Sequence, residues 1–237
     1  MKKFLVSAFA LAAFAGPAMA ADLYTPAPAM YDWNGAYLGG HAGYLWGDAN
    51  LKEGSFAEGG GEFDGFVGGV IGGWNFQSGN WVFGIEGDFG WAGVDGTGGG
   101  GMSELDEIAT IYEYDMDWNA HVRGRVGMTL GEEGRTFLFI AGGLAVADFD
   151  LKQDAWDSAP GGTYTGWTIG GGVNHAFSNN LIAGLEVLYD DYGSKGYKWG
   201  ETPNACVETS CDWQPSVGHS VDLDAFTVRG TLSYHFN

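Results

Sequence analysis

The sequence has few basic residues, few prolines and only two cysteines. Ten Lys and Arg stand against thirty Asp and Glu, which gives a formal net charge of −20 at pH 7. Such an acidic chain repels phosphate backbones, which excludes nucleic acid as a partner. After the first twenty residues, no stretch approaches the roughly 18 to 20 apolar residues of a membrane-spanning helix. If the chain spans a membrane, it must therefore do so as a closed β-barrel, which also pairs every backbone polar group.

The N-terminus has the pattern of a secretory signal. Two lysines precede an apolar run over residues 4–15, and Ala-Met-Ala follows as a small-residue cleavage site. We predict a signal peptide over residues 1–20, cleaved between Ala20 and Ala21. The next stretch, residues 21–32, is rich in Pro and Ala and too short to fold, so it predicts a flexible periplasmic linker.

The rest of the chain, residues 33–237, shows eight segments in which apolar and polar residues alternate. In the clearest, Trp81, Phe83 and Ile85 fall on one face while Glu86 and Asp88 fall on the other. A period of two with an apolar outer face is typical of strands in a transmembrane barrel. The predicted strands span residues 36–46, 65–76, 81–91, 117–128, 136–149 and 166–177, a seventh begins at Leu181, and an eighth spans residues 225–237.

Short and long connections alternate between these strands, as they do between the periplasmic and external ends of membrane barrels. The long connections are expected over residues 47–64, 93–115, 150–165 and 191–220. The pattern predicts an all-β fold, an eight-stranded antiparallel up-and-down transmembrane β-barrel. The strand over 136–149 is apolar on both faces, so its register is not determined. A soluble lipid-binding β-barrel is the alternative fold, and it would bury the aromatic faces instead.

Several motifs resemble one family. Residues 31–44 read Y-D-W-N-G-A-Y-L-G-G-H-A-G-Y, and G-G-W-N-F, G-W-T-I-G-G-G-V, L-E-V-L-Y and T-V-R-G follow at residues 72–76, 166–173, 185–189 and 227–230. This series resembles the porin-family, opacity-like surface proteins of alphaproteobacterial outer membranes. Relatives include immunodominant outer-membrane antigens, adhesins and hemin-binding proteins.

The resemblance implies export to the outer membrane of a Gram-negative cell. The expected partners are outer-membrane lipid, lipopolysaccharide and the barrel-assembly machinery, with a host or surface ligand left open. Tyr234 and Phe236 match the C-terminal assembly signal of such barrels. Family members usually end on the aromatic residue itself, whereas Asn237 follows here.

The lumen of an eight-stranded barrel is just wide enough for side chains to fill. The inward polar residues predicted from the alternation are Glu86, Asp88, Asn119, His121, Arg123, Arg125, Glu186, Asp190, Arg229 and His235. Buried charges persist only when paired, so these residues predict ion-pair ladders that block a wide channel. A structural or surface-interaction role follows, in envelope integrity or adhesion. A narrow porin that passes small solutes or ions is the alternative.

The remaining candidate sites lie in the long connections. Cys206 and Cys211 sit in one of them, and export into an oxidising compartment favours a disulfide between them. His219 and Tyr197 are the candidate axial ligands for surface hemin binding, the second alternative function. The acidic residues show no calcium-loop spacing, and no Ser, His and acid spacing suits hydrolysis. The sequence therefore predicts neither an enzyme nor a bound metal or cofactor.

Overall fold

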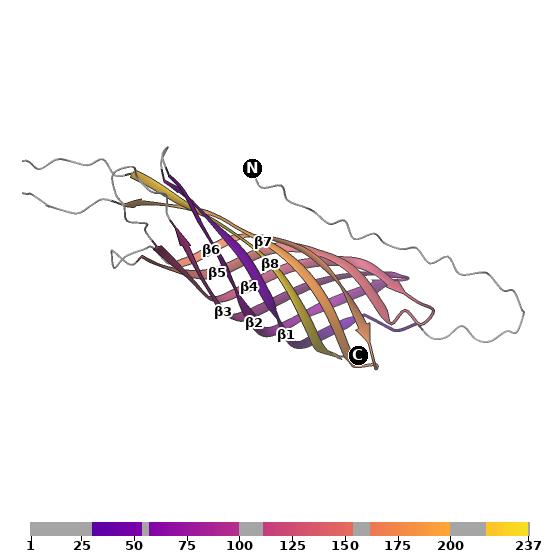
Figure 1. The fold of residues 1–237 in the computed structure, drawn as a ribbon. Helices are drawn as coiled ribbons and strands as arrows, with labels where there is room; N and C mark the ends of the chain where they lie inside the picture. The colour runs from indigo at the N-terminus through magenta and orange to yellow at the C-terminus, as the bar shows by residue number, and fades with distance from the viewer. Residues whose placement is uncertain (1–29, 54–56, 100–110, 154–161, 200–216, 237) are drawn as a thin grey trace, which may run out of the picture.

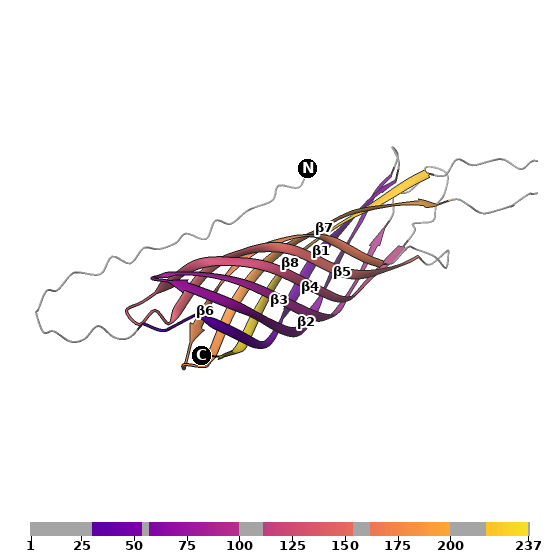
Figure 2. The same cartoon turned by 180° about the vertical axis from the view of Figure 1, so that it is seen from behind.

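The computed structural model describes residues 30–53, 57–99, 111–153, 162–199 and 217–236. They form eight strands, which are β1 Gly35–Glu53, β2 Ala57–Ser78, β3 Trp81–Gly99, β4 Ile111–Leu130, β5 Thr136–Gln153, β6 Gly162–Ala176, β7 Leu181–Trp199 and β8 Val217–Phe236. Each strand pairs antiparallel with the next, and β1 pairs with β8, so the sheet closes into one tilted barrel (Figures 1 and 2). This arrangement confirms the predicted eight-stranded fold. No helix in the described ranges is long and apolar enough to cross a membrane.

The strands are longer than the sequence predicted. They run for 15 to 22 residues, and much of what was expected as long connections is paired sheet. The β1–β2 ladder continues without a break from Gly35↔Asn75 to Glu53↔Ala57. Beyond the membrane, both faces of a strand can be polar, so the apolar alternation fades while the backbone ladder continues. The prediction of strand ends from alternation was therefore wrong at the external end.

Apolar side chains cover the outer face between two aromatic belts. The belt near the three short turns, which mark the periplasmic end of such barrels, comprises Phe76, Trp81, Phe83, Phe177, Tyr234 and Phe236, and the external belt comprises Trp46, Phe66, Trp91, Trp167, Tyr189 and Phe226. From Trp81 to Trp91, ten residues at about 3.3 Å each and a tilt of about 45° cover about 23 Å of depth. This height suits a bilayer, and the exposed aromatics exclude the soluble lipid-binding barrel.

The structure settles the register of β5. Leu138, Ile140 and Leu144 are exposed on the outer face, whereas Phe137 and Phe139 are buried inside. Both faces are apolar because the inner face of β5 lies against apolar layers of the lumen, while its outer face contacts lipid. Periodicity alone could not separate these two environments.

Ile85→Arg tests the membrane face. The Ile85 side chain is 65% exposed, midway between the two belts on β3. We expect the substitution to lower the free energy of unfolding by about 2–4 kcal/mol, measured by urea titration in lipid vesicles, because the charge enters hydrocarbon. Thr97→Arg is the matched control, since Thr97 faces outward on the same strand beyond the external belt. Equal costs at the two positions would mean that Ile85 does not face lipid.

Two rows of carboxylates lie just outside the external belt. Register places Asp191, Asp224, Asp48 and Glu62 side by side across β7, β8, β1 and β2. A second row joins Asp64, Asp95, Asp115 and Asp150 across β2, β3, β4 and β5. Like charges directly opposite each other destabilise a sheet. We call these eight residues the acidic collar.

Asp224→Asn is expected to stabilise the barrel by up to about 1 kcal/mol at low salt, because it relieves repulsion from a carboxylate on each side. Added salt should shrink the gain by screening the charges. Asp148→Asn is the matched control, because Asp148 lies opposite Trp118 and Thr163 and outside both rows. Thermal unfolding at two salt concentrations measures the effect, and an equal gain at both positions would contradict the cross-strand explanation.

The interior is filled in three layers. The periplasmic layer contains an apolar cluster of Tyr31, Trp33, Val82, Phe137, Phe139, Ala141, Ala176 and Ile182. Buried polar side chains of β6 and β8, Asn174, Thr231 and Ser233, complete this layer. The central layer, midway between the two belts, is charged. The external layer is apolar again and includes Leu45, Phe63, Val94, Met116, Phe149, Tyr164, Tyr192 and Leu223. The charged layer thus lies between an external apolar cluster and a periplasmic layer of apolar and small polar side chains.

Candidate functional site

The charged layer is built by the inward positions of four strands. β3 supplies Glu86 and Asp88, β4 supplies His121, Arg123 and Arg125, β7 supplies Glu186 and Asp190, and β8 supplies Arg229. Alternation turns each of these side chains inward, away from lipid. Each is at most 7% exposed. We call these eight residues the lumen network.

Arg123 is the hub of the lumen network. Its Nη2 donates to Glu86 Oε1 on the neighbouring strand and lies 3.3 Å from Asp88 Oδ2. It also donates to Glu186 Oε2 at 3.2 Å. Glu186 belongs to β7, which is not a neighbour of β4 in the sheet. This contact therefore crosses the lumen, whereas the sequence predicted pairing only along adjacent strands.

Arg229 makes a second contact across the lumen. Its Nε and Nη2 donate to Glu186 Oε2 at 3.0 and 2.9 Å, which is the adjacent-strand pair that the sequence predicted. Its Nη1 lies 3.1 Å from Asp88 Oδ1, and its Nη2 donates to Asp88 Oδ2 at 3.1 Å. β8 and β3 are separated by two strands in the barrel. The bidentate pair thus ties opposite parts of the wall together.

Arg125 joins the charged layer to the periplasmic apolar layer. Its Nη1 donates to Glu86 Oε2, which also accepts from the Tyr37 hydroxyl at 2.6 Å. The guanidinium lies 4.5 Å from the centroid of the Phe139 ring and 5.3 Å from that of Phe137. Aromatic faces stabilise a desolvated cation. Arg125 is thereby held between a carboxylate and the aromatic layer.

His121 completes the charge balance of the lumen network. Its Nδ1 lies 2.8 Å from Asp88 Oδ1 and its Nε2 lies 3.3 Å from Asp190 Oδ1. With His121 protonated, four cations match the four carboxylates of the lumen network, which is the condition for burying them all.

The other interior residues predicted from the sequence lie apart from this network. Asn119 is buried on β4 beside Gly90, and a Cβ at Gly90 would lie 2.6 Å from its Oδ1. His235 is buried at the periplasmic mouth, where its Nδ1 contacts the Tyr31 hydroxyl at 3.0 Å. The sequence assigned Tyr31 to the flexible linker, but Tyr31 is packed and 6% exposed. The linker prediction therefore fails at that residue, and residues 21–29 lie outside the described ranges.

Sequence reasoning missed Tyr37 and Trp33 as interior residues. Tyr37 had a usable signal, because it alternates inward with His41 on β1. Trp33 had no such signal, because it precedes β1 and is not part of the alternating pattern of a strand.

Several predicted sites remain predictions. Ala20, Ala21, Cys206 and Cys211 lie outside the described residues, so the signal cleavage and the disulfide are untested. Tyr197 and His219, the hemin candidates, are direct partners in the β7–β8 register.

The predicted assembly signal lies at the periplasmic end of β8. Tyr234 and Phe236 are both exposed in the periplasmic belt, with ring centroids 5.0 Å apart.

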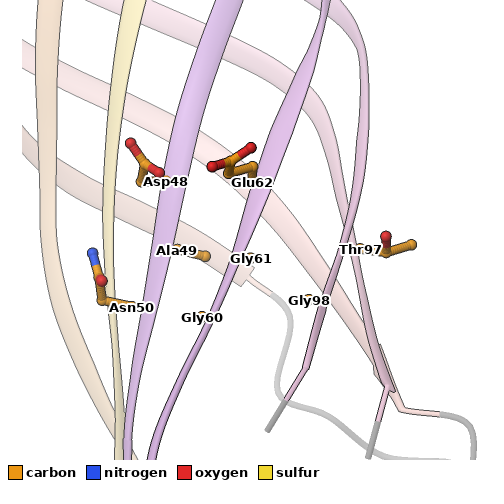
Figure 3. Close-up of a pocket in the computed structure, with 8 residues that line it drawn as sticks. All are labelled: Asp48, Ala49, Asn50, Gly60, Gly61, Glu62, Thr97 and Gly98. Atoms are coloured by element: carbon orange, nitrogen blue, oxygen red, sulfur yellow. The ribbon is translucent and has the colours of Figure 1, made fainter. Parts of the chain in front are cut away.

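A cavity of about 600 Å³ opens in the external part of β1, β2 and β3, away from the lumen network (Figure 3). It is lined by Asp48, Ala49, Asn50, Gly60, Gly61, Glu62, Thr97 and Gly98. The glycines are required here, since a Cβ at Gly61 would lie 2.6 Å from the Tyr114 ring. Within the described ranges, no group of three or more His, Cys, Asp or Glu side chains could hold a metal ion.

Comparison with known proteins identifies the family of this barrel. The model of the family described as "Outer membrane protein beta-barrel domain" matches residues 6–236. The chain belongs to this outer membrane protein beta-barrel family. It is a protein of the Gram-negative outer membrane, as the sequence predicted.

Relatives in this family come from alphaproteobacteria. The chain is 35% identical over 165 residues to the "22 kDa outer membrane protein" of Rhizobium leguminosarum bv. viciae, covering 70% of this chain and 67% of the relative. It is 32% identical to the "31 kDa outer-membrane immunogenic protein" of Brucella melitensis biotype 1, covering 100% of both. Among solved structures, the outer membrane protein OprG from Pseudomonas aeruginosa matches with a TM-score of 0.58 at 10% identity, covering 87% of this chain and 100% of OprG. The OprG match supports the fold alone.

Arg123→Ala tests the lumen network. We expect the free energy of unfolding to fall by about 3–5 kcal/mol, because buried carboxylates lose their partner. Glu133→Ala is the control, since the Glu133 side chain is 60% exposed and its ion pair with Arg135, at 2.8 Å, lies at a turn. Losing this pair should cost about 1 kcal/mol or less. Urea titration in vesicles gives both values. Similar costs for the two variants would show that the lumen pairs are not desolvated.

Proposed function

We propose that this barrel is a closed structural and surface-interaction protein of the outer membrane, not a porin. The observation that carries the proposal is the lumen network, whose ion pairs cross the interior and join opposite walls. Pairs of this kind occupy the space that a water-filled path would need.

The apolar layers support the same conclusion. In the external layer, Phe149 is fully buried, and its ring centroid lies 5.4 to 5.7 Å from those of Phe63, Tyr164 and Tyr192. These four packed aromatic rings fill this part of the lumen. An open porin instead has a polar, water-filled interior.

The outer surface then carries the interactions. The belts contact outer-membrane lipid, and the acidic collar lies at the depth of the lipopolysaccharide headgroups. The Brucella relatives are named immunogenic outer-membrane proteins, which supports a surface role for this chain and leaves a host or surface ligand as the external partner. The Tyr234–Phe236 end of β8 is the expected contact for the barrel-assembly machinery.

The same geometry argues against an enzyme. The carboxylates and His121 of the lumen network are all held in ion pairs and at most 7% exposed, so no substrate reaches them. A general acid or base must come within hydrogen-bond reach of its substrate. We therefore propose a non-enzymatic role.

Single-channel recording of the refolded protein in planar bilayers tests the closed lumen. We expect no stable conductance steps, because three filled layers separate the two mouths. Heat-modifiable mobility, a difference in electrophoretic migration between the unheated and the boiled sample, confirms that the barrel is folded. Large, stable steps that scale with salt concentration would replace this proposal with the porin function.

A further inference from the structure

The chain before β1 folds back under the periplasmic mouth. Trp33 is completely buried and Tyr31 is 6% exposed, while Asp32 and Asn34 between and after them are exposed. Tyr31 and Trp33 pack edge to face, with ring centroids 5.0 Å apart. The Trp33 ring also lies 5.4 Å from Phe137 of β5. These two side chains therefore belong to the periplasmic apolar layer although neither lies on a strand.

Hydrogen bonds fix Trp33 to the end of β2 and to the β4–β5 turn. Its backbone N–H donates to Gln77 Oε1 at 2.7 Å, at the end of β2. Its indole Nε1–H donates to the carbonyl of Gly134, in the β4–β5 turn, at 2.8 Å. A buried indole N–H needs a hydrogen-bond acceptor. These two hydrogen bonds, and not burial alone, therefore determine where Trp33 lies.

Tyr31 reaches the remaining part of the mouth. Its N–H donates to the Glu133 carbonyl in the β4–β5 turn at 2.8 Å. Its hydroxyl donates to the Asn179 carbonyl in the β6–β7 turn at 2.9 Å and contacts His235 Nδ1 on β8 at 3.0 Å. Burial raises the pKa of Tyr31 to about 12, so the hydroxyl keeps its proton through neutral pH. Together, Tyr31 and Trp33 contact the end of β2, the β4–β5 and β6–β7 turns, and the last strand.

The local sequence is suited to this turn back under the barrel. Asp32 Oδ1 accepts from the Asn34 N–H at 2.9 Å, and Asn34 Oδ1 accepts from the Gln77 N–H at 2.7 Å. Gly35 then enters β1 with a φ of 124°. A Cβ there would lie 2.7 Å from the Phe236 carbonyl oxygen, so the bend requires glycine.

We propose that Tyr31–Asn34 is a built-in periplasmic plug that seals the lumen network from the periplasm and can be released without opening the external side. The proposal rests on the closed lumen of the proposed function. It follows from the position of the segment, which covers the mouth below Phe137, Phe139 and Arg125. It also follows from its attachment, which uses side chains and turns and no strand pairing, so that the barrel ladder is complete without it.

Cysteine accessibility tests the plug. Thr231 faces the lumen from β8, two inward positions above His235, and is 8% exposed. Thr231→Cys, in a background with Cys206→Ser and Cys211→Ser, would be labelled in detergent by a charged methanethiosulfonate. We expect slow labelling with the plug in place. Trp33→Ala should speed it by on the order of a hundredfold, because removing a buried Trp weakens the seal strongly.

Trp91→Ala is the matched control, since it removes an indole from the external belt and leaves the plug intact. Its labelling rate should equal that of the parent. Every variant is first checked for heat-modifiable mobility. If Trp33→Ala does not fold, the milder Tyr31→Phe/Trp33→Phe variant, which loses the hydroxyl and indole hydrogen bonds, should fold and label faster than the parent.

Unchanged labelling in a folded plug variant, or rapid labelling of the parent, would overturn the plug. Failure of both plug variants to fold would also overturn it, because it would make the segment part of the folding core. Single-channel recording separates this inference from the proposed function. A plug variant should show no conductance, because its external layer is still filled. Conductance from the parent protein would instead refute the closed barrel.

Discussion

The closed backbone ladder is the constraint on which this structure depends. In hydrocarbon, an unpaired strand edge would leave a row of unsatisfied N–H and C=O groups. The β1–β8 ladder removes that edge by pairing the first strand with the last from Ala36↔Phe236 to Glu53↔His219. Once eight strands close, their number limits the width of the lumen, and the period of two divides every strand into a lipid face and an interior face. The belts and the lumen network follow from this division.

The narrow lumen explains why charge is arranged so differently inside and outside. Inside, each carboxylate of the lumen network meets a cation, and Arg123 and Arg229 reach across the barrel to find one. Outside, the acidic collar sets carboxylates side by side in two rows. Water and salt screen the outer charges, whereas a buried charge without a partner costs several kcal/mol. In the described ranges, charge is therefore balanced inside the barrel and negative charge is concentrated in the acidic collar.

The sequence predicted the fold and the facing of its side chains, but not the contacts between opposite walls. Alternation placed Glu86 and Arg229 inside, because periodicity reports the face of a strand. It could not pair Arg229 with Asp88, since that contact depends on how the barrel closes in three dimensions. It also failed for β5, whose two faces are both apolar, and for Tyr31, whose burial comes from contacts with turns. The external ends of the strands were missed because backbone pairing continues beyond the residues in which apolar and polar side chains alternate.

The layering of the interior bears directly on function. Packed layers on both sides keep the lumen network buried, and the lower local dielectric strengthens each ion pair. The same burial makes the network costly to open, because any path through it would expose unpaired charges on both walls. A rigid, filled lumen leaves only the two ends and the outer face free to meet other molecules. The periplasmic end is filled by Tyr31 and Trp33 from the chain itself, so the surface role that we propose falls to the acidic external rim.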